Sequence, residues 1–435
     1  MTDQEQAQGA DDRQLGRRRF AKNMAHQYLL QIAQYLFPFI TVPYLTRVLG
    51  PDVYAVRAYV IAAMTFMQAF LNYGFESYGI KAIAESVHDA VRTNRVTSCI
   101  VYLRLALCAG GAAVMAVVTP LVPILAANPA YVAIAYAGAC LTSLLPDYVF
   151  QGQEDMKVIT QRYVGSQAVA VACIFLFVHG PEQLLLVPAF EGLATLIAVV
   201  WSWHDVLFVR KVRLVAVPLG QLAQSFRDST VFFVSSASTT LFSSLTTLLI
   251  GIYVADEAQV SYWSIAMMAV SAIQALYSPI ANSLYPHMVK RRDFALAWRL
   301  LLLGSAVALV GSIAYAALSP MVMGIIGGEA YLPGSYVIAY TAPVLFFSYV
   351  AILLGYPVLA AVGRVRLLTT SSVIAAAFHV AGLFGLLAFG SFTIACIAVL
   401  RDLTEAVLAA LRTAFALPYL RSNPPKGASH GAHHS

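Results

Sequence analysis

Twelve apolar segments of about membrane-spanning length follow one another between Met24 and Leu417, separated by short polar connectors. We predict spans at 24–45, 58–80, 97–121, 131–150, 163–178, 184–207, 231–254, 261–286, 300–326, 337–357, 368–389 and 392–417. A backbone exposed to lipid must satisfy its own hydrogen bonds, and polar residues in these segments recur at helical rather than alternate spacing. The sequence therefore predicts an all-α integral membrane protein with twelve transmembrane helices.

The composition excludes most soluble classes of protein. Hydrophobic residues make up 60% of the chain and charged residues 11%, whereas about 25% of the residues of a soluble domain are charged. The net charge of +6 does not indicate nucleic-acid binding, because the basic residues lie in short connectors rather than on one face. The five cysteines lie inside apolar segments without the spacing of a metal site, so we predict no metal site and no cofactor.

The distribution of basic residues predicts the orientation in the membrane. Lysine and arginine are concentrated in every other connector, and this excess marks the cytoplasmic side of most membrane proteins. The basic connectors hold Arg17, Arg18, Arg19, Lys22, Lys81, Arg92, Arg95, Lys157, Arg162, Arg210, Lys211, Arg213, Arg227, Lys290, Arg291, Arg292, Arg364, Arg366, Arg421 and Lys426. The opposite connectors hold only Arg47 and Arg57. Both termini are therefore predicted to be cytoplasmic.

A faint internal repeat indicates two halves. The segment Tyr59–Met64 resembles Tyr262–Met267, and each follows a short acidic outer connector. Repeated six-helix halves with a cavity between them are typical of transporters, although two unrelated spans can match this well by chance. We predict a cytoplasmic segment at 1–22, an N-terminal lobe at 23–208, a cytoplasmic linker at 209–230, a C-terminal lobe at 231–417 and a disordered cytoplasmic tail at 418–435.

One motif carries a resemblance to a known family. Pro43-Tyr44-Leu45-Thr46-Arg47-Val48-Leu49-Gly50-Pro51, followed by Tyr54, resembles the signature after the first span of bacterial polysaccharide-unit flippases. These are the O-antigen and capsule translocases of the multidrug/oligosaccharidyl-lipid/polysaccharide exporter superfamily. Other parts of the chain resemble the same family in order and spacing. They are Asn23, Leu71–Phe75 with Gly74, Lys81–Ala84, Phe150–Lys157 with Gln151 and Gly152, and Ala360–Arg364. The chain departs from the pattern at Ala55, where the family usually has glycine.

The resemblance implies a fold and a function. It implies two six-helix lobes related by a pseudo-two-fold repeat, in the bacterial cytoplasmic (inner) membrane. The implied cargo is an undecaprenyl-diphosphate-linked oligosaccharide, which alternating access moves from the cytoplasmic to the outer leaflet. The other implied partners are H⁺ or Na⁺ as coupling ion, membrane lipids and the polysaccharide polymerase machinery. Such a carrier needs cations for the diphosphate, and arginine binds phosphate oxygens bidentately.

The final predicted span contains three charged residues, and a charge near the membrane centre costs at least about 2.5 kcal/mol. Arg401 and Glu405 are four residues apart, and Asp402 and Glu405 are three apart, so each pair shares a helix face. The group is either a self-neutralising structural element or part of the cavity. In the second case Arg401 contacts the diphosphate or a sugar acid, and Asp402 or Glu405 acts as counter-ion or proton carrier.

Three further arginines are candidate substrate-binding residues. Arg104 lies about two turns into the third predicted span, where it either faces the cavity or snorkels to the cytoplasmic surface. Arg47 and Arg57 lie on the outer side, and interfacial anchoring is the alternative for both, more so for Arg57. We favour Arg47 first, because it lies within the family signature.

Carboxylates in the spans are candidates for ion coupling, because a buried carboxyl can carry a proton. Glu191 lies in the outer half of the sixth predicted span. Glu76 and Asp147 lie near cytoplasmic ends of spans, where acids are more often solvated or paired. His379 lies in the middle of the eleventh span, and we favour a core histidine with satisfied hydrogen bonds over a proton relay.

Two other classes of function stay open. A cation-coupled multidrug exporter of the same superfamily would have an acid-rich and aromatic site, whereas the arginines indicate an anionic cargo. A membrane-embedded polysaccharide polymerase would use the same lipid substrate but usually has a large outer loop, and each outer connector here is short. The sequence shows no paired-carboxylate site and no phosphate-binding glycine loop. We therefore predict a lipid-linked oligosaccharide flippase rather than an enzyme.

Overall fold

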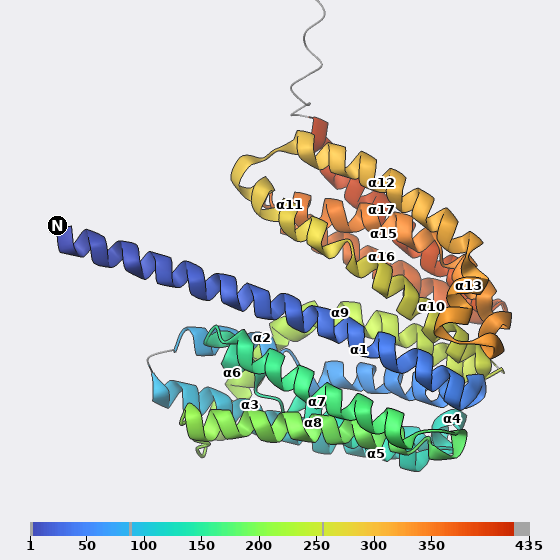
Figure 1. The fold of residues 1–435 in the computed structure, drawn as a ribbon, viewed down its shortest axis with the longest axis horizontal. Helices are drawn as coiled ribbons and strands as arrows, with labels where there is room; N and C mark the ends of the chain where they lie inside the picture. Colours follow the sequence, from blue (N-terminus) through green and yellow to red (C-terminus); the bar gives the residue numbers. More distant parts are fainter. Residues whose placement is uncertain (1–2, 87–88, 255, 422–435) are drawn as a thin grey trace, which may run out of the picture. The chain divides into compact units, whose positions relative to one another are not determined.

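The computed structural model describes residues 3–86, 89–254 and 256–421, and within them leaves out the side chains of 3–22, 231, 234–243, 286, 290, 291 and 421. The described residues form helices and no strand (Figure 1). Every predicted span lies on helix, which confirms an all-α membrane protein. By length and apolarity, nine described stretches rather than twelve qualify as spans, and the first, Asn23–Ala84, is 62 residues long and contains two predicted spans.

The chain divides into two compact units, Met1–Ser244 and Leu245–Ser435. The division falls inside α9 (Leu219–Tyr253), which begins within the predicted linker 209–230. The last helix, α17 (Ile394–Arg421), continues four residues into the predicted tail 418–435, whose remainder lies outside the described residues. The lobes at 23–208 and 231–417 stay predictions.

The first unit begins with α1 (Asp3–Asn72), which contains a sharp break at Gly50 (φ 73°, ψ 170°). Glycine enters this left-handed region without steric cost, and Pro51 directly after it suits the first turn of a new helix. The chain reverses direction there, so α1 is a helical hairpin (Figure 1). The unit continues through α2 (Phe75–Ala84), α3 (Ala90–Val118), η1 (Thr119–Leu121), α4 (Pro123–Ala126), α5 (Pro129–Ser143), α6 (Asp147–Gly152), α7 (Met156–Phe177), η2 (Pro181–Gln183), α8 (Leu186–His204) and the π-helix η3 (Asp205–Val209).

Four helices of the first unit form the frame of the candidate site. The helix α7 packs against α1 and α8, and α5 packs against α8 and α1. At one end of these helices, α2 packs on α6 around fully buried Phe75, Ile83 and Phe150. A Cβ at Gly152 would lie 2.8 Å from the Cβ of Ile83, so the family-motif glycine permits this close approach.

The second unit contains ten helical segments after α9. They are α10 (Ala258–Ala275), α11 (Ser278–Arg291), α12 (Phe294–Ala317), α13 (Ser319–Ile326), η4 (Glu329–Gly334), α14 (Ser335–Tyr340), α15 (Pro343–Leu353), η5 (Leu354–Ala360), α16 (Val365–Ala388) and α17. The helix α15 continues directly into the π-helix η5, which contains Pro357. The hydrophobic core of the second unit contains residues of α11, α12, α15, η5 and α17, which pack around buried Met288, Tyr349 and Leu359.

Candidate functional site

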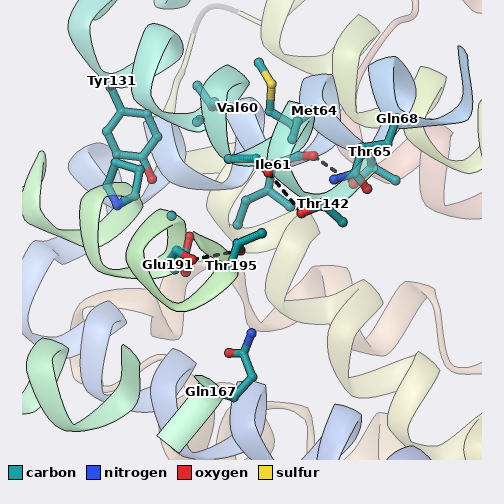
Figure 2. A pocket seen from close by; sticks show the side chains of 15 residues that line it. Val60, Ile61, Met64, Thr65, Gln68, Tyr131, Thr142, Gln167, Glu191 and Thr195 are labelled. Carbon is teal, nitrogen blue, oxygen red and sulfur yellow. Dashed lines mark hydrogen bonds between the residues drawn. The ribbon is translucent and has the colours of Figure 1, made fainter. Parts of the chain in front are cut away.

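A polar cavity of about 300 Å³ lies in the first unit between α1, α5, α7 and α8. Its wall is formed by Val60, Ile61, Met64, Thr65, Gln68, Tyr131, Ala135, Gly138, Ala139, Thr142, Gln167, Pro188, Glu191, Gly192 and Thr195. Figure 2 shows Tyr131 and Glu191 on one side of the view, and Thr65 and Gln68 on the other. Hydroxyl, amide and carboxylate groups are unusual in a span, so this wall is suited to a hydrated ligand.

Glycines make room for the cavity. A Cβ built on Gly138 of α5 would meet, at 3.9 Å, the Cα of Gly192 on α8, so the two helices approach each other through facing glycines. A Cβ at Gly192 would have no atom within 4 Å. The absence of side chains at these two positions therefore leaves open the space beside Glu191.

Arg57 and Glu191 form an ion pair beside the cavity. Arg57 Nη2 donates to Glu191 Oε1 at 2.7 Å, and Nη1 donates to the Tyr54 hydroxyl at 3.5 Å. The Arg57 side chain is 9% exposed, whereas that of Glu191 is 38% exposed and contributes to the cavity wall. Arg57 Nε is buried with no hydrogen-bond partner. The arginine therefore lies behind the glutamate and is not an exposed interfacial anchor.

The family motif positions this pair. The break at Gly50 begins the second arm of the α1 hairpin, and Arg57 follows seven residues later. Arg47, in contrast, is exposed and donates to the Pro43 carbonyl oxygen of its own helix at 2.5 Å. Arg47 is not among the residues that form the cavity wall. Arg57 is not among them either, but its partner Glu191 is, so Arg57 rather than Arg47 lies next to the cavity wall.

A second charged cluster lies around the junction of α5 and α6. Arg104 is 2% exposed and its Nη1 donates to the Leu145 carbonyl oxygen at 2.8 Å. Its Nη2 lies 3.5 Å from Glu76, and Gln151 of the family motif donates to the same carboxylate at 2.7 Å. The guanidinium therefore neutralises Glu76 and binds a carbonyl at the end of α5, away from the cavity described above.

Asp147 belongs to the same region. Arg162 donates to both of its carboxylate oxygens, at 2.5 and 2.9 Å, and to the Ser202 hydroxyl at 2.8 Å. The sequence placed Arg162 in a cytoplasmic connector, and this placement is wrong. The helix α7 begins at Met156, so Arg162 lies inside it and is 3% exposed. Sequence reasoning therefore missed a buried, bidentate ion pair.

In the second unit, Arg401 and Glu405 pair within α17. Arg401 Nη2 donates to Glu405 Oε1 at 2.7 Å, and the two side chains are 19% and 10% exposed. Asp402 Oδ1 is buried without a hydrogen bond. Arg401 and Glu405 therefore form an ion pair on one helix face, as their spacing indicates.

His379 is a core histidine with satisfied hydrogen bonds. The Thr404 hydroxyl donates to the Leu400 carbonyl oxygen at 2.7 Å, so it accepts from His379 Nδ1, which lies 2.8 Å away. A neutral imidazole with a proton on Nδ1 then accepts at Nε2 from the Thr246 hydroxyl, 2.9 Å away. The structure gives both ring nitrogens a local partner.

Sequence reasoning also missed Arg412, which lies in α17 within the predicted span 392–417. Its Nη1 donates to the Ala351 carbonyl oxygen at 2.7 Å, its Nη2 to Ser372 at 3.1 Å and its Nε to Ser371 at 3.3 Å. An arginine inside an apolar span was the available signal. Among the described residues, no group of three or more metal-binding side chains is found.

Comparisons of the sequence identify relatives. Residues 20–291, more than half of the chain, match the family of polysaccharide biosynthesis proteins. A candidate O-antigen transporter of Escherichia coli strain K12 is 24% identical over 268 residues, which are 61% of this chain and 64% of that relative. The match thus spans less than two thirds of that relative. A candidate O-antigen transporter of Shigella dysenteriae is 26% identical over 322 residues, which are 72% of this chain and 80% of that relative.

Solved membrane transporters have the same fold. An inward-facing multidrug resistance MATE family transporter of the MOP superfamily has a TM-score of 0.70 at 14% identity, over 91% of this chain and 95% of its own. The lipid II flippase MurJ, in an inward closed conformation, has a TM-score of 0.66 at 11% identity, over 91% of this chain and 89% of the MurJ chain. At these identities the likeness establishes the fold alone. The chain belongs to the polysaccharide biosynthesis protein family and has the fold shared by MATE transporters and the lipid II flippase.

Proposed function

We propose that this protein is a flippase for undecaprenyl-diphosphate-linked oligosaccharide units, which it moves from the cytoplasmic to the outer leaflet of the bacterial inner membrane. Family membership, the names of the two relatives and the fold shared with a lipid II flippase support this function. The activity is transport rather than catalysis. In this proposal the lobes at 23–208 and 231–417, joined by the linker at 209–230, alternate between inward and outward access.

The observation that carries the proposal is the Arg57–Glu191 pair at the wall of the polar cavity. A buried guanidinium binds phosphate oxygens well, because its planar donors match them and the low dielectric strengthens the attraction. The Glu191 carboxylate occupies those donors at 2.7 Å and itself faces the cavity. An anionic group that reaches Arg57 must therefore displace Glu191, and a proton on Glu191 makes this displacement easier.

This exchange supplies the proposed coupling to an ion gradient. A proton or Na⁺ that neutralises Glu191 weakens its hold on Arg57, and the diphosphate then competes for the guanidinium. Arg104 and Arg401 stay proposed diphosphate contacts of lower rank, because their partners Glu76 and Glu405 do not line the cavity. Polysaccharide polymerase is a proposed partner, since it would consume the translocated unit.

The test is lipid mass spectrometry on cells that lack the gene, with glycosidase treatment of intact spheroplasts to report the leaflet. A flippase predicts that a protected, undecaprenyl-diphosphate-linked oligosaccharide accumulates inside. Wild-type protein and Lys81→Ala, a change at a side chain that is 67% exposed, should restore translocation. Arg57→Ala should not restore it at equal protein level. Normal and fully accessible lipid-linked sugar in the deletion strain would contradict the proposal.

A cation-coupled drug exporter is the second candidate, because Glu191 and the Tyr131 ring both line the cavity. A carboxylate and an aromatic ring are suited to a cationic drug. Drug-resistance assays in the same deletion strain separate the two functions. Loss of resistance with unchanged lipid-linked sugar would favour the exporter.

A further inference from the structure

Buried arginines in the spans of this protein have carboxylate partners, and Arg412 departs from this pattern. Arg57, Arg104, Arg162 and Arg401 pair with Glu191, Glu76, Asp147 and Glu405, respectively. Arg412 is only partly exposed, but its three hydrogen bonds go to a carbonyl and two hydroxyls. Among the described residues, no carboxylate lies within ion-pair distance of it. Its hydrogen-bond partners are therefore all neutral, and Glu405 acts on its charge only from two turns away along α17.

The neutral partners fix the guanidinium in one orientation. Ser371 and Ser372 both donate to the Leu368 carbonyl oxygen, at 2.8 and 3.2 Å, so their oxygens are free to accept from Arg412. The guanidinium has five N–H groups, and two of them have no hydrogen bond to the described residues. One is on Nη1 and one on Nη2, because each of these nitrogens makes a single bond. Arg412 thus retains donors for an anion.

The acids nearest to Arg412 along α17 are Asp402 and Glu405, and Glu405, two turns away, is already paired with Arg401. Residues 343–390 and 406–421 include no aspartate or glutamate, while Arg364 and Arg366 are exposed at the start of α16. Because α16 and α17 are packed neighbours joined by a short turn, the start of α16 and the end of α17 lie at the same end of the unit. Ser372 is seven residues from the start of α16, or about 10 Å along the helix. Arg412 therefore lies about two turns from the end of the helix pair that carries the exposed Arg364 and Arg366.

We propose that Arg412, with Ser371 and Ser372, forms a binding site for the phosphate of a membrane lipid at this end of the second unit. The phosphate pairs directly with the guanidinium and accepts from its two free N–H groups, while the acyl or prenyl chains stay in the bilayer. The lipid is either a phospholipid of the adjacent leaflet or the polyprenyl diphosphate carrier. The inference depends on the neutral partners and unused N–H groups of Arg412 and not on flippase activity, so failure of one leaves the other intact.

Native mass spectrometry of the full-length protein, purified in detergent, tests the site. Phosphatidylglycerol, undecaprenyl diphosphate and inorganic phosphate are titrated separately. Arg412→Gln should weaken binding of at least one of the two lipids about tenfold, as expected for a charge-assisted contact. Arg412→Lys should retain more binding because it keeps the charge. Arg299→Gln is the matched control, since this exposed arginine lies near the start of α12 in the same unit.

The outcomes separate the sources of the phosphate. A loss confined to phosphatidylglycerol assigns the site to a leaflet lipid, and a loss confined to undecaprenyl diphosphate assigns it to the carrier lipid. A loss for inorganic phosphate alone, or equal lipid binding by Arg412→Gln and Arg299→Gln, overturns the proposal. If Arg412→Gln does not fold, Gly355→Ala replaces it, because the added Cβ would lie 2.7 Å from Arg412 Nη1 and displace the guanidinium without changing its charge.

Discussion

Arg57 and Glu191 are 134 residues apart in sequence, and Arg57 Nη2 lies 2.7 Å from Glu191 Oε1, yet the two side chains are exposed to different extents. The Arg57 side chain is 9% exposed and the Glu191 side chain 38%. The two halves of this ion pair therefore differ in what happens when the partner is removed. A buried cation left alone keeps its full desolvation penalty, whereas an exposed carboxylate regains water.

The first prediction concerns the order of destabilisation in this pair. Glu191→Gln should lower the free energy of unfolding by about 3 kcal/mol, because it leaves the buried Arg57 without a counter-ion. Arg57→Gln should cost about 1 kcal/mol, because the remaining carboxylate is partly hydrated. Thermal unfolding of the purified variants in one detergent measures both. A larger loss in Arg57→Gln than in Glu191→Gln would contradict the burial seen here.

The second prediction concerns glycines with positive φ in the first unit. Gly74 (φ 71°) lies before α2, and a Cβ there would lie 2.5 Å from the Phe233 backbone nitrogen. Gly74→Ala should therefore lower the free energy of unfolding by more than the roughly 1–2 kcal/mol that the left-handed backbone alone costs an alanine. The Cβ of Gly50→Ala meets no atom within 4 Å, so this change should cost only the strain of the φ 73°, ψ 170° backbone, about 1–3 kcal/mol. Unfolding midpoints give this order.

Gly110 is the matched control for both substitutions. It lies inside α3 with helical φ, and a Cβ there would meet nothing within 4 Å. Gly110→Ala should leave stability unchanged or raise it by up to about 1 kcal/mol. If all three alanine variants unfold at the same temperature, the positive φ values at Gly50 and Gly74 do not constrain the fold.

The third prediction concerns the volume of the cavity. Gly192 borders this space of about 300 Å³, and a Cβ added there would meet no atom within 4 Å. Gly192→Leu should fill part of the cavity and reduce translocation about tenfold, while protein level and unfolding temperature stay close to wild type. Gly192→Ala is the control and should retain most of the activity. Full activity of Gly192→Leu would show that cargo does not pass through this space.

The fourth prediction is a pH dependence of stability at the start of α12. Asp293 accepts from the Leu296 backbone N–H at 3.0 Å and from His287, and these bonds hold the pKa of its carboxyl below the usual 3.8. Because the pKa of Asp293 is lower in the folded state, its contribution to the free energy of unfolding is fully present above pH 3.8. That contribution is lost as the pH falls through the folded-state pKa. Asp293→Asn should keep the helix cap but remove this acid-dependent part, whereas Asp293→Ala should cost about 1 kcal/mol at neutral pH.

Unfolding temperatures across an acid series measure this difference. The wild-type curve should fall toward the Asp293→Asn curve only below about pH 4, where the carboxyl takes up a proton. Curves that stay parallel down to the lowest pH would exclude a role for the Asp293 charge.

The helices of this protein were predictable because a single physical requirement, an apolar run that satisfies its own backbone, determines them. The break at Gly50 was likewise marked by Leu49-Gly50-Pro51, since glycine and proline restrict the backbone locally. Helix ends were harder to place. The predicted fifth span begins at residue 163, whereas α7 begins at Met156, about two turns earlier. Because of this difference, the prediction assigned the buried Arg162 to a connector.

The partners of the charged residues were not predictable in the same way. Helical spacing could pair Arg401 with Glu405, because both lie on one helix. No local rule could pair Arg57 with Glu191 or Arg104 with Glu76, since these contacts depend on how helices pack. The sequence favoured Arg47 over Arg57 because Arg47 lies within the family signature, whereas the structure pairs Arg57 with Glu191 of the cavity wall and leaves Arg47 outside that wall.

The threonines of the cavity determine the chemistry that a ligand meets there. Thr65, Thr142 and Thr195 each donate their hydroxyl proton to a carbonyl oxygen four residues earlier in their own helix, at 2.8, 3.0 and 2.9 Å. Their oxygens therefore offer lone pairs, and the Glu191 carboxylate adds more. These lone pairs can accept from sugar hydroxyls, and the side-chain amides of Gln68 and Gln167 add donors to the same wall. Under the proposed function, the lone pairs of the cavity would bind the sugar end of the lipid-linked oligosaccharide and Arg57 its diphosphate.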